Sequence, residues 1–415
     1  MNISQIHYLC IKIDLGMILA DIAEYVTDKI SSNDVSLNNY VTTDSLLQNK
    51  RGRECAQNLP PMPCALIHFQ PKDILIANIR PYLKKIWFAD IEGGCSSDVL
   101  VFRAKEGHFP NFLYATLMQD SFYDYVMKGV KGSKMPRGDK EQIMRYKMPT
   151  FSSDEEQNIG KIVVDIEKKL QLSRALNDNL EKMAKQLYDY WFVQFDFPDE
   201  NGRPYKSSGG AMVWNEKLKR EIPKQWNDGI LSDIANITMG QSPEGSSYNK
   251  VGEGIIFYQG STDFGIRFPD IRQYTTAPSR YANKGDILMS VRAPVGALNI
   301  ANNDCCIGRG LSALSSKVGS MTHLYYTMNY FRLRFEDMNS AGTTFGSITK
   351  DELYGLPIIL PAHDVLLSFE KICAPIYDKQ MEIGEETESL TKQRDELLPL
   401  LMNGQTSVNY HLSHG

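Results

Sequence analysis

Apolar residues recur at alternating intervals of three and four positions along a proline-free stretch between Pro149 and Pro198. The stripe comprises Ile159, Val163, Ile166, Leu170, Leu176, Leu180, Met183, Leu187 and Tyr190. This spacing places its residues on one narrow face of a helix and is typical of a coiled-coil seam. Ser152 or Ser153, followed by two glutamates, supplies a helix cap and first-turn acids. The pattern predicts a helix over 153–192, about 60 Å long at a rise of about 1.5 Å per residue.

A second stripe near the end of the chain predicts another long helix, over 363–404. It comprises Phe369, Ile372, Ile376, Lys379, Ile383, Glu386, Leu390, Gln393, Leu397 and Leu400. Ser173 interrupts the first stripe, and Lys379, Glu386 and Gln393 interrupt the second; polar residues in a seam often fix its register. The two stripes favour an intramolecular antiparallel coiled coil. The alternative is that each helix packs separately on its own domain.

Short sequence matches recur between the two halves of the chain at an offset of about 212 residues. Residues 16–23 (GMILADIA) match 228–235 (DGILSDIA), and 72–81 (KDILIANIRP) match 285–294 (GDILMSVRAP). In each half, a Gly/Ser-rich loop, an apolar run with proline and a long helix then follow in the same order. Three features in one order at one offset indicate a tandem duplication, and hence a pseudo-twofold internal repeat.

The remaining patterns predict an α+β, mixed fold with two similar globular domains, at 15–152 and 227–362. Strands are expected at Ala65–Phe69, Asp73–Ile79, Ile86–Ile91, Val99–Phe102, Ile255–Gln259 and Asp286–Val291, and helices at Phe112–Met127 and His323–Glu336. Residues 193–226, rich in proline, glycine, lysine and serine, predict a linker without regular structure. Residues 1–14 form an unassigned extension and 405–415 a tail.

Composition narrows the class of protein further. Hydrophobic residues make up 42% and charged residues 23%, which is ordinary for a globular protein. No segment approaches a membrane-spanning length, and Met1–Gly16 lacks the features of a secretion signal. Seven cysteines, odd in number and without a CxxC pair, favour a reducing cytoplasm and argue against a zinc site. A cytoplasmic location is therefore expected.

The net charge of −5 argues mildly against nucleic acid as a partner, because nucleic-acid-binding proteins are usually basic. However, residues 378–396 contain seven acids and three bases, so much of the negative charge belongs to the second long helix. The globular parts are closer to neutral and carry local basic loops.

Catalytic and metal-binding motifs are absent from the sequence. It contains no GxxxxGK[ST], HExxH or GxSxG, and no GxGxxG after a strand, and its seven histidines do not pair at ligand spacing. No catalytic residue, metal ligand or cofactor site is assigned to this chain. The residues favour a binding protein with two similar parts.

Candidate DNA contacts lie in loops of both halves. In the first half they are basic residues among glycines, where cations and backbone N–H groups can approach phosphate; a solvated loop is the alternative. In the second half they are Arg, Gln and hydroxyl side chains, which can reach base edges or phosphates. The first set is Arg80, Lys84, Lys85, Lys128, Lys131, Lys134 and Arg137. The second is Gln241, Ser242, Gln259, Arg292, Arg309, Thr343, Thr344 and Ser347.

Several motifs resemble the specificity subunit of type I restriction-modification systems. They are 187–198 (LYDYWFVQFDFP), 217–226 (KLKREIPKQW), 240–243 (GQSP), 285–288 (GDIL) with 292–296 (RAPVG), 307–310 (IGRG) and 390–404 (LTKQRDELLPLLMNG). The resemblance extends from about residue 15 to residue 404. The first half departs from it, because it lacks the GQSP and RAPVG strings and has 78–82 (NIRPY) instead.

The resemblance implies two target recognition domains that each read one half of a split sequence in double-stranded DNA. The two helices would set the gap and dock two modification subunits, through Tyr190, Trp191, Phe192, Leu397 and Leu398. S-adenosylmethionine would bind the modification subunits, and ATP and Mg²⁺ would serve the restriction subunits, with no cofactor in this chain. The alternatives are a stand-alone nuclease or methyltransferase and a coiled-coil adaptor that binds only protein.

Overall fold

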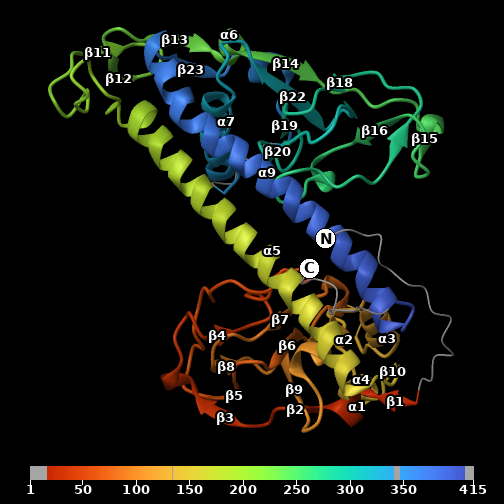
Figure 1. Cartoon of the computed structure of the whole chain (residues 1–415). Helices are drawn as coiled ribbons and strands as arrows, with labels where there is room; N and C mark the ends of the chain where they lie inside the picture. The colour runs from red at the N-terminus through yellow and green to blue at the C-terminus, as the bar shows by residue number, and fades with distance from the viewer. Residues whose placement is uncertain (1–15, 133, 341–345, 407–415) are drawn as a thin grey trace, which may run out of the picture. The chain divides into compact units, whose positions relative to one another are not determined.

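The computed structural model describes residues 16–132, 134–340 and 346–406. The chain forms two compact units (Figure 1). Unit 1 contains the described residues up to Arg174 and from Thr387 onward, and unit 2 contains Ala175–Glu386. Each unit includes part of both long helices, α5 (Ser153–Tyr188) and α9 (His363–Met402), together with its own β-sheets. The predicted mixed α and β fold class is confirmed.

Unit 1 has two four-stranded sheets and a short strand pair among its described residues. The first sheet is antiparallel, in the order β2 (Ala23–Tyr25), β9 (Val99–Ala104), β6 (Ile74–Ala77) and β7 (Ile86–Phe88). The second has the order β3 (Lys29–Ser31), β5 (Ala65–Phe69), β8 (Gly93–Cys95) and β4 (Tyr40–Val41), with β8 and β4 parallel. β1 (Met17–Ile18) pairs with β10 (Lys147–Met148).

Strand β6 contributes to two cores of unit 1, because successive side chains of a strand point to opposite faces. Ile74 and Ile76 belong to the core that contains the helices, whereas Leu75 and Ala77 belong to the core that joins the two sheets. All four side chains are buried. Since burial of one aliphatic side chain contributes about 1.5–3 kcal/mol, this apolar run fixes β6 as a central strand.

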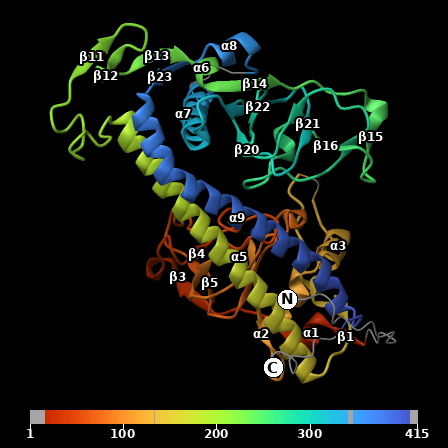
Figure 2. The same cartoon turned by 45° about the horizontal axis from the view of Figure 1, so that its top comes forward.

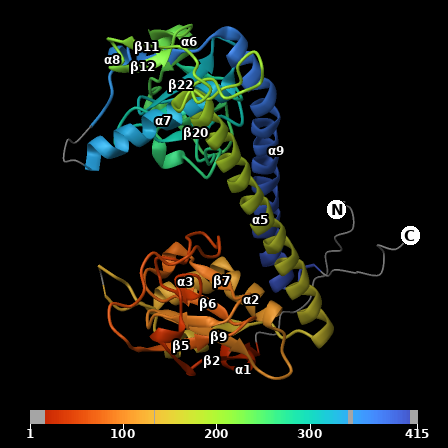
Figure 3. The same cartoon turned by 90° about the vertical axis from the view of Figure 1, so that its left-hand side faces the viewer.

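Short helices and the ends of the long helices complete unit 1. The short helices are α1 (Leu19–Ile22), α2 (Pro110–Met118), α3 (Asp120–Lys128) and α4 (Lys140–Met144). Figure 3 shows α2 against the N-terminal end of α5, where a Cβ at Gly160 would lie 2.5 Å from the backbone N of Phe112. Leu398, Leu401 and Met402 of α9 are buried in the same core. Both ends of the described chain therefore build unit 1.

The single helix predicted at Phe112–Met127 is wrong, because α2 and α3 are separated at Gln119. The backbone of Gln119 has φ −63° and ψ 142°, which is extended. Its side-chain Nε2 donates to the carbonyl oxygen of Thr116 at 3.2 Å and satisfies an end carbonyl of α2. No proline or glycine marks the break, so the apolar pattern continues across it.

Unit 2 has a four-stranded sheet, a five-stranded sheet and two strand pairs in its described part. The first sheet is antiparallel, in the order β14 (Ala235–Met239), β22 (Leu311–Ser316), β19 (Ile287–Ser290) and β20 (Leu298–Ile300). The second has the order β15 (Tyr248–Asn249), β17 (Tyr274–Thr275), β16 (Ile255–Tyr258), β21 (Cys305–Ile307) and β18 (Tyr281–Ala282), with β16 and β21 parallel. β13 (Asn227–Ile230) pairs with β23 (Pro357–Leu360).

Strand β19 of unit 2 has the same double role as β6. Ile287 and Met289 pack on the core beside the helices, and Leu288 packs on the core of the two sheets. The helices outside α5 and α9 are α6 (Leu231–Ile234), α7 (Met321–Ser340) and α8 (Lys350–Tyr354).

The linker predicted at 193–226 contains a β-hairpin, so the prediction that it lacks regular structure is wrong. β11 (Met212–Asn215) pairs with β12 (Arg220–Pro223). Phe197 stacks on Trp226 with ring centroids 4.9 Å apart, and both belong to a buried core of unit 2. Turn-forming residues lie before the hairpin in the sequence. The aromatic residues of the stretch are buried in a core of unit 2 and thereby stabilise it.

The long helices contact each other within each unit and run antiparallel there. Figure 2 shows α5 and α9 side by side. In unit 2, Gln380 Nε2 donates to Glu181 at 2.8 Å, and the rings of Phe369 and Trp191 lie 5.7 Å apart. In unit 1, Arg394 donates to Glu167 at 2.7 Å.

The predicted seams are wrong in their central parts. Leu176 and Met183 of α5 are 47% and 56% exposed, whereas Ala184, outside the predicted stripe, is buried. Ser173, the predicted polar interruption of the stripe, is buried as expected. On α9, Ile372 is exposed and Gln380 and Arg394 are buried. Polar residues that pair with one another occupy the helix contact, so hydrophobicity alone assigned the wrong face.

Most predicted strands are present, with small shifts of their ends. β5 has the predicted bounds, whereas the strand predicted at Ile86–Ile91 ends at Phe88. None of the helices in the described part of the chain is long and apolar enough to span a membrane.

Candidate nucleic-acid interface

Predicted polar residues of unit 2 lie together where β14, β21 and β22 meet. Gln241 and Ser242 follow β14, and the backbone N of Gln241 donates to the carbonyl oxygen of Ile307 at 3.0 Å. Arg309 lies between β21 and β22, and its backbone N donates to Oγ of Ser242 at 3.3 Å. These contacts hold the three predicted residues side by side.

Glycines allow Gln259, which follows β16, to approach the same loop. A Cβ at Gly308 would lie 3.0 Å from the Cα of Gln259, and a Cβ at Gly310 would lie 2.8 Å from its carbonyl oxygen. The contact at Gly310 is closer than a Cβ atom can come without a shift of the backbone, and the contact at Gly308 is tighter than most Cβ contacts. The glycines on either side of Arg309 therefore permit the backbone contact that places Gln259 beside it.

Arg292 and Ser347 lie on the adjoining edge, where they form an isolated antiparallel bridge. The backbone N of Val291 donates to the carbonyl oxygen of Gly310 at 2.9 Å and links this edge to the Arg309 loop. Thr343 and Thr344 lie outside the described residues. We call the residues brought together here the unit 2 polar cluster; they are Gln241, Ser242, Gln259, Arg292, Arg309 and Ser347.

The longest side chains of the unit 2 polar cluster are available for a ligand. Gln259, Arg292 and Arg309 are exposed, and their side chains form no hydrogen bond or ion pair with other described residues. Two free guanidinium groups beside a free amide can contact phosphates and the acceptor edges of guanine and adenine.

Unit 1 places part of its predicted basic set at an equivalent edge. Ile79 forms an isolated bridge with Arg137, which also bridges Lys131. The backbone N of Arg80 donates to the carbonyl oxygen of Pro136 at 2.8 Å. The side chains of Arg80, Lys131 and Arg137 are exposed on this edge, and so are those of Lys128, at the end of α3, and Lys134, in the loop that follows. We call these five residues the unit 1 basic loop.

Carboxylates already pair with two members of the unit 1 basic loop. Lys131 Nζ lies 2.6 Å from Asp139 Oδ2, and Arg137 Nη2 lies 3.0 Å from Asp98 Oδ1. The hydrogen bond from Lys131 lowers the pKa of the Asp139 carboxyl below its ordinary value. Exposed ion pairs are weak, so a phosphate can replace the carboxylate of either one.

Lys84 and Lys85 are separated from the unit 1 basic loop by their partners. Lys84 Nζ lies 2.9 Å from Asp120, and Lys85 Nζ donates to the carbonyl oxygen of Thr43 at 2.5 Å. Both side chains are half-buried. Their predicted contact with DNA stays a prediction, and it would require these bonds to break.

The predicted docking residues divide into exposed and buried ones. Tyr190 is exposed and Leu397 is half-buried. Trp191 and Phe192 lie in a core of unit 2, and Leu398 lies in a core of unit 1. The three buried side chains pack in the cores of their units and are not accessible on the surface. Docking through any of the five residues stays a prediction.

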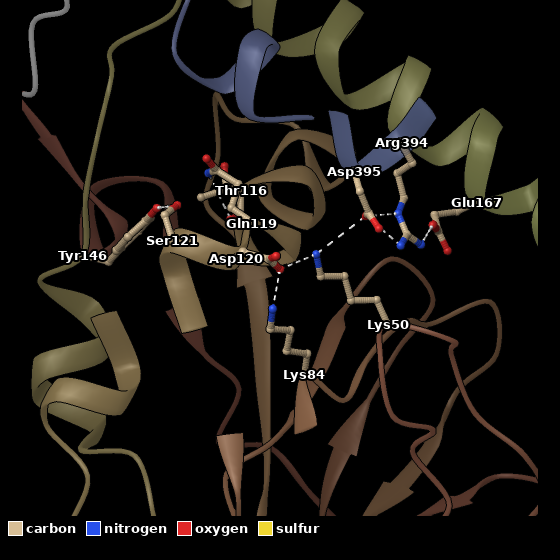
Figure 4. Close-up of polar contacts among 10 residues, drawn as sticks. All are labelled: Lys50, Lys84, Thr116, Gln119, Asp120, Ser121, Tyr146, Glu167, Arg394 and Asp395. Atoms are coloured by element: carbon tan, nitrogen blue, oxygen red, sulfur yellow. Dashed lines mark hydrogen bonds and ion pairs between the residues drawn. The ribbon is translucent and has the colours of Figure 1, made fainter. Parts of the chain in front are cut away.

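Sequence reasoning missed a charged network in unit 1, which Figure 4 shows. Lys50 reaches Asp120 and Asp395, and Arg394 lies between Asp395 and Glu167. Lys50, Glu167 and Arg394 are buried. Glu167 and Arg394 lie next to the predicted stripes and not on them, so their positions in the sequence did not indicate burial. Lys50 lies in a loop, and its position did not indicate burial either.

Groups of three or more potential metal ligands are not found among the described residues. Four cysteines, Cys95, Cys305, Cys306 and Cys373, are buried. Burial raises the pKa of the Cys305 thiol to about 12, which makes it a poor nucleophile.

Comparison with known proteins identifies relatives over most of the chain. A family described as "Type I restriction modification DNA specificity domain" matches residues 223–385. The putative type I restriction enzyme MjaX specificity subunit of Methanocaldococcus jannaschii is 30% identical over 308 residues, which cover 73% of this chain and 69% of the relative. The type I restriction enzyme HindI specificity subunit of Haemophilus influenzae is 22% identical over 459 residues, covering 93% of this chain and 98% of the relative.

A solved structure shares the fold. The crystal structure of the type I restriction-modification system S subunit from M. genitalium matches with a TM-score of 0.56 at 15% identity, and the match covers 93% of this chain and 95% of that one. The likeness in fold therefore extends well beyond residues 223–385.

Proposed function

This chain belongs to the family of type I restriction enzyme specificity subunits, and we propose that each of its two units reads one half of a bipartite DNA target. A specificity subunit is the non-catalytic, DNA-recognising member of a restriction-modification complex, so DNA and the other subunits of such a complex are its partners. The observation that carries the proposal is the unit 2 polar cluster, in which the side chains of Gln259, Arg292 and Arg309 are exposed and form no hydrogen bond or ion pair with other described residues.

Unit 1 supplies the second reading surface in this proposal, because the two units have matching connections. Both first sheets place a buried strand, β6 or β19, between two antiparallel neighbours. After each of these strands comes an isolated bridge, Ile79 with Arg137 in unit 1 and Arg292 with Ser347 in unit 2. These features support an internal repeat that presents equivalent edges to DNA.

Different side chains on equivalent edges favour different half-sites. The unit 1 basic loop carries lysines and arginines, and the unit 2 polar cluster mixes arginine, glutamine and serine. Arg and Gln select guanine and adenine, whereas lysine mainly neutralises phosphate. We infer an asymmetric target whose second half is read by more direct base contacts.

The long helices act as a spacer in this proposal. Their antiparallel contacts within each unit, Glu167 with Arg394 and Glu181 with Gln380, support an intramolecular coiled coil. DNA rises about 3.4 Å per base pair, so a rigid spacer would allow one gap between the half-sites. Changing the length of both helices together would change the gap and leave both half-sites unaltered.

The same helices would dock two modification subunits, one on each unit. In unit 2, α5 carries an apolar stripe of exposed and half-buried residues, which we call the α5 stripe; it comprises Leu176, Leu180, Met183, Leu187 and Tyr190. In unit 1, the half-buried residues Leu390, Leu397 and Leu400 of α9 recur at similar spacing. An apolar stripe at heptad spacing fits an apolar helix of a partner.

Cofactors would belong to these partners. We propose that S-adenosylmethionine binds the modification subunits, that ATP and Mg²⁺ serve the restriction subunits, and that this chain binds none of them. In methylation, this chain would position the DNA target for the modification subunits.

Methylome sequencing tests the proposed function. The chain is expressed with its modification subunit in a host that lacks other methyltransferases, and modified adenines are mapped. The expected result is one bipartite motif with a fixed gap. A continuous motif, or methylation that does not depend on this chain, would contradict the proposal.

A further inference from the structure

In each unit, one basic side chain extends from a loop of the sheet-containing part and is buried against the long helices. Lys50 of unit 1 is 5% exposed and Arg267 of unit 2 is 9% exposed. A cation is buried only at a large desolvation cost unless partners compensate it. Both residues find partners on the helices, and both lie in loops that lead to the reading surfaces.

In unit 1, Lys50 joins the globular part to α9 (Figure 4). Its Nζ lies 2.7 Å from Asp120 Oδ1 at the start of α3, and 3.9 Å from Asp395 Oδ1 on α9. Asp395 in turn lies 2.8 Å from Arg394, which is paired with Glu167 of α5. One chain of charges therefore runs from α3 to both long helices.

The loop that carries Lys50 also holds the turn that begins at Arg80. The backbone N of Lys50 donates to the carbonyl oxygen of Lys84 at 2.8 Å, and that of Leu83 donates to Arg80 at 3.0 Å. The side chain of Lys84 lies 2.9 Å from Asp120, the partner of Lys50. Two separate bonds therefore tie the Arg80 turn to the network around Lys50.

In unit 2, Arg267 lies between the two long helices. Its Nη2 donates to Gln380 Oε1 at 3.2 Å, and its Nη1 lies 3.5 Å from Glu181 Oε2. The guanidinium also lies over the rings of Tyr325 and Tyr377, at 5.7 and 5.3 Å from their centroids. Ion pair, hydrogen bond and ring contacts together compensate the buried charge.

A short loop connects Arg267 to the unit 2 polar cluster. The backbone N of Gln259 donates to the carboxylate of Asp263 at 2.7 Å, and the backbone N of Asp270 donates to the carbonyl oxygen of Asp263 at 2.7 Å. Phe268 fixes the same loop on α9, where a Cβ at Gly384 would lie 2.6 Å from its ring. A displacement of Arg267 would therefore reach Gln259 through fewer than ten residues.

We propose that Lys50 and Arg267 are positioning residues, each of which fixes the reading surface of its own unit on the long helices. This inference rests on the proposed function. Because both side chains are buried, neither touches DNA. Their role is to fix the orientation of each reading surface, and of the half-site that it binds, relative to the helices on which the modification subunits dock.

The test uses the full complex with Lys50→Met and Arg267→Met, each of which is the other's control. Methylation rates are measured on the cognate DNA and on DNA with one base pair changed in either half-site. The half-sites are assigned with Arg309→Ala, which alters the one read by unit 2. We expect Lys50→Met to lower discrimination in the unit 1 half-site by about tenfold, the order of one base contact, and to leave the other unchanged. Arg267→Met should do the reverse.

Two further measurements separate positioning from direct contact and from unfolding. The slope of log Kd against log salt should equal that of the unaltered complex, because no phosphate contact is lost. Lys50→Arg and Arg267→Lys should recover part of the discrimination.

The inference would be overturned by an equal loss of discrimination in both half-sites, by no loss of discrimination in either, or by a smaller slope of log Kd against log salt. A bipartite target read by the unaltered complex, with unchanged discrimination in both methionine variants, would contradict this inference alone. Failure of the unaltered complex to recognise a bipartite target would contradict the proposed function and this inference with it.

Discussion

The guanidinium Nη1 of Arg394 lies 2.7 Å from Glu167 Oε1, and the two side chains are 3% and 5% exposed. The pair joins α9 to α5 inside unit 1. A buried ion pair contributes little more than an apolar pair of similar size, because desolvation offsets the attraction. Removing one partner is costly, since the other charge stays buried and uncompensated.

We expect Arg394→Leu to reduce the free energy of unfolding of unit 1 by about 3–5 kcal/mol, and Glu167→Leu together with Arg394→Leu to recover most of that loss. Urea unfolding followed by far-UV circular dichroism measures both. Lys392→Leu, at an exposed position of α9, is the control and should change stability little. A double variant as unstable as Arg394→Leu would contradict the prediction.

Replacing Lys128, Lys131, Lys134 and Arg137 together by alanine should weaken DNA binding by a similar factor for all sequences. Each lost phosphate contact lowers the slope of log affinity against log salt by about 0.9. The single changes at Lys128 and Lys134 should have the largest effects, because Lys131 and Arg137 already have carboxylate partners. Titrations at several salt concentrations measure the slope.

Lys224→Ala, at an exposed lysine of the hairpin region, controls for loss of net charge. An unchanged slope in the fourfold variant would favour a solvated loop or a protein-only adaptor instead.

Arg309→Ala should relax specificity at one position of one half-site, at a cost of about 1–3 kcal/mol in discrimination. The fold should persist, because the neighbouring glycines and the backbone contacts stay in place. Competition binding with single-base variants of the target measures the effect. Arg203→Ala, whose arginine pairs with Asp199, is the control. A uniform loss across both half-sites would mean that Arg309 contacts only phosphate.

Met183→Glu should weaken association with the modification subunit without unfolding unit 2. Met183 is at the middle of the α5 stripe and faces solvent, so a glutamate is tolerated in the free chain and costly under an apolar partner. Co-purification and titration of the two subunits measure the association. Lys182→Glu places the same acid about 100° around the helix and should have a smaller effect. Equal effects of the two would contradict docking on the α5 stripe.

Unit 2 should lose stability as the pH falls from about 6.5 towards 4. Burial of His323 lowers the pKa of its imidazole to about 4, below the value of about 6.5 in the unfolded chain. Between these values the unfolded chain binds a proton that the folded chain excludes, so this contribution is complete above pH 6.5 and is lost on acidification, by up to about 1.4 kcal/mol per pH unit.

Denaturant unfolding at several pH values checks the His323 contribution. His323→Gln should flatten the dependence in this window, whereas His363→Gln, at the exposed start of α9, should leave it unchanged. An identical slope in His323→Gln and the unaltered chain would rule out the assignment.

Sequence predicted the features that depend on local pattern. The apolar runs at β6 and β19 indicated strands, and in the structure every side chain of both strands is buried. The glycines around Arg309 and the turn at Gln241 indicated loops, and these loops meet in the structure.

Features that depend on tertiary partners escaped prediction. Gln380 faces inward because Glu181 and Arg267 meet it, and Leu176 faces outward, so periodicity of hydrophobicity chose the wrong side in the middle of the helices. Lys50 and Arg267 lie in irregular loops, where no spacing indicates that a charged side chain is buried.

The core of unit 1 is completed by Leu398, Leu401 and Met402, which the ribosome adds more than two hundred residues after the rest of that core. Unit 2 has all its residues by Glu386, so the part synthesised first matures last. A nascent chain released before residue 398 would carry an open apolar hole and be a substrate for proteases.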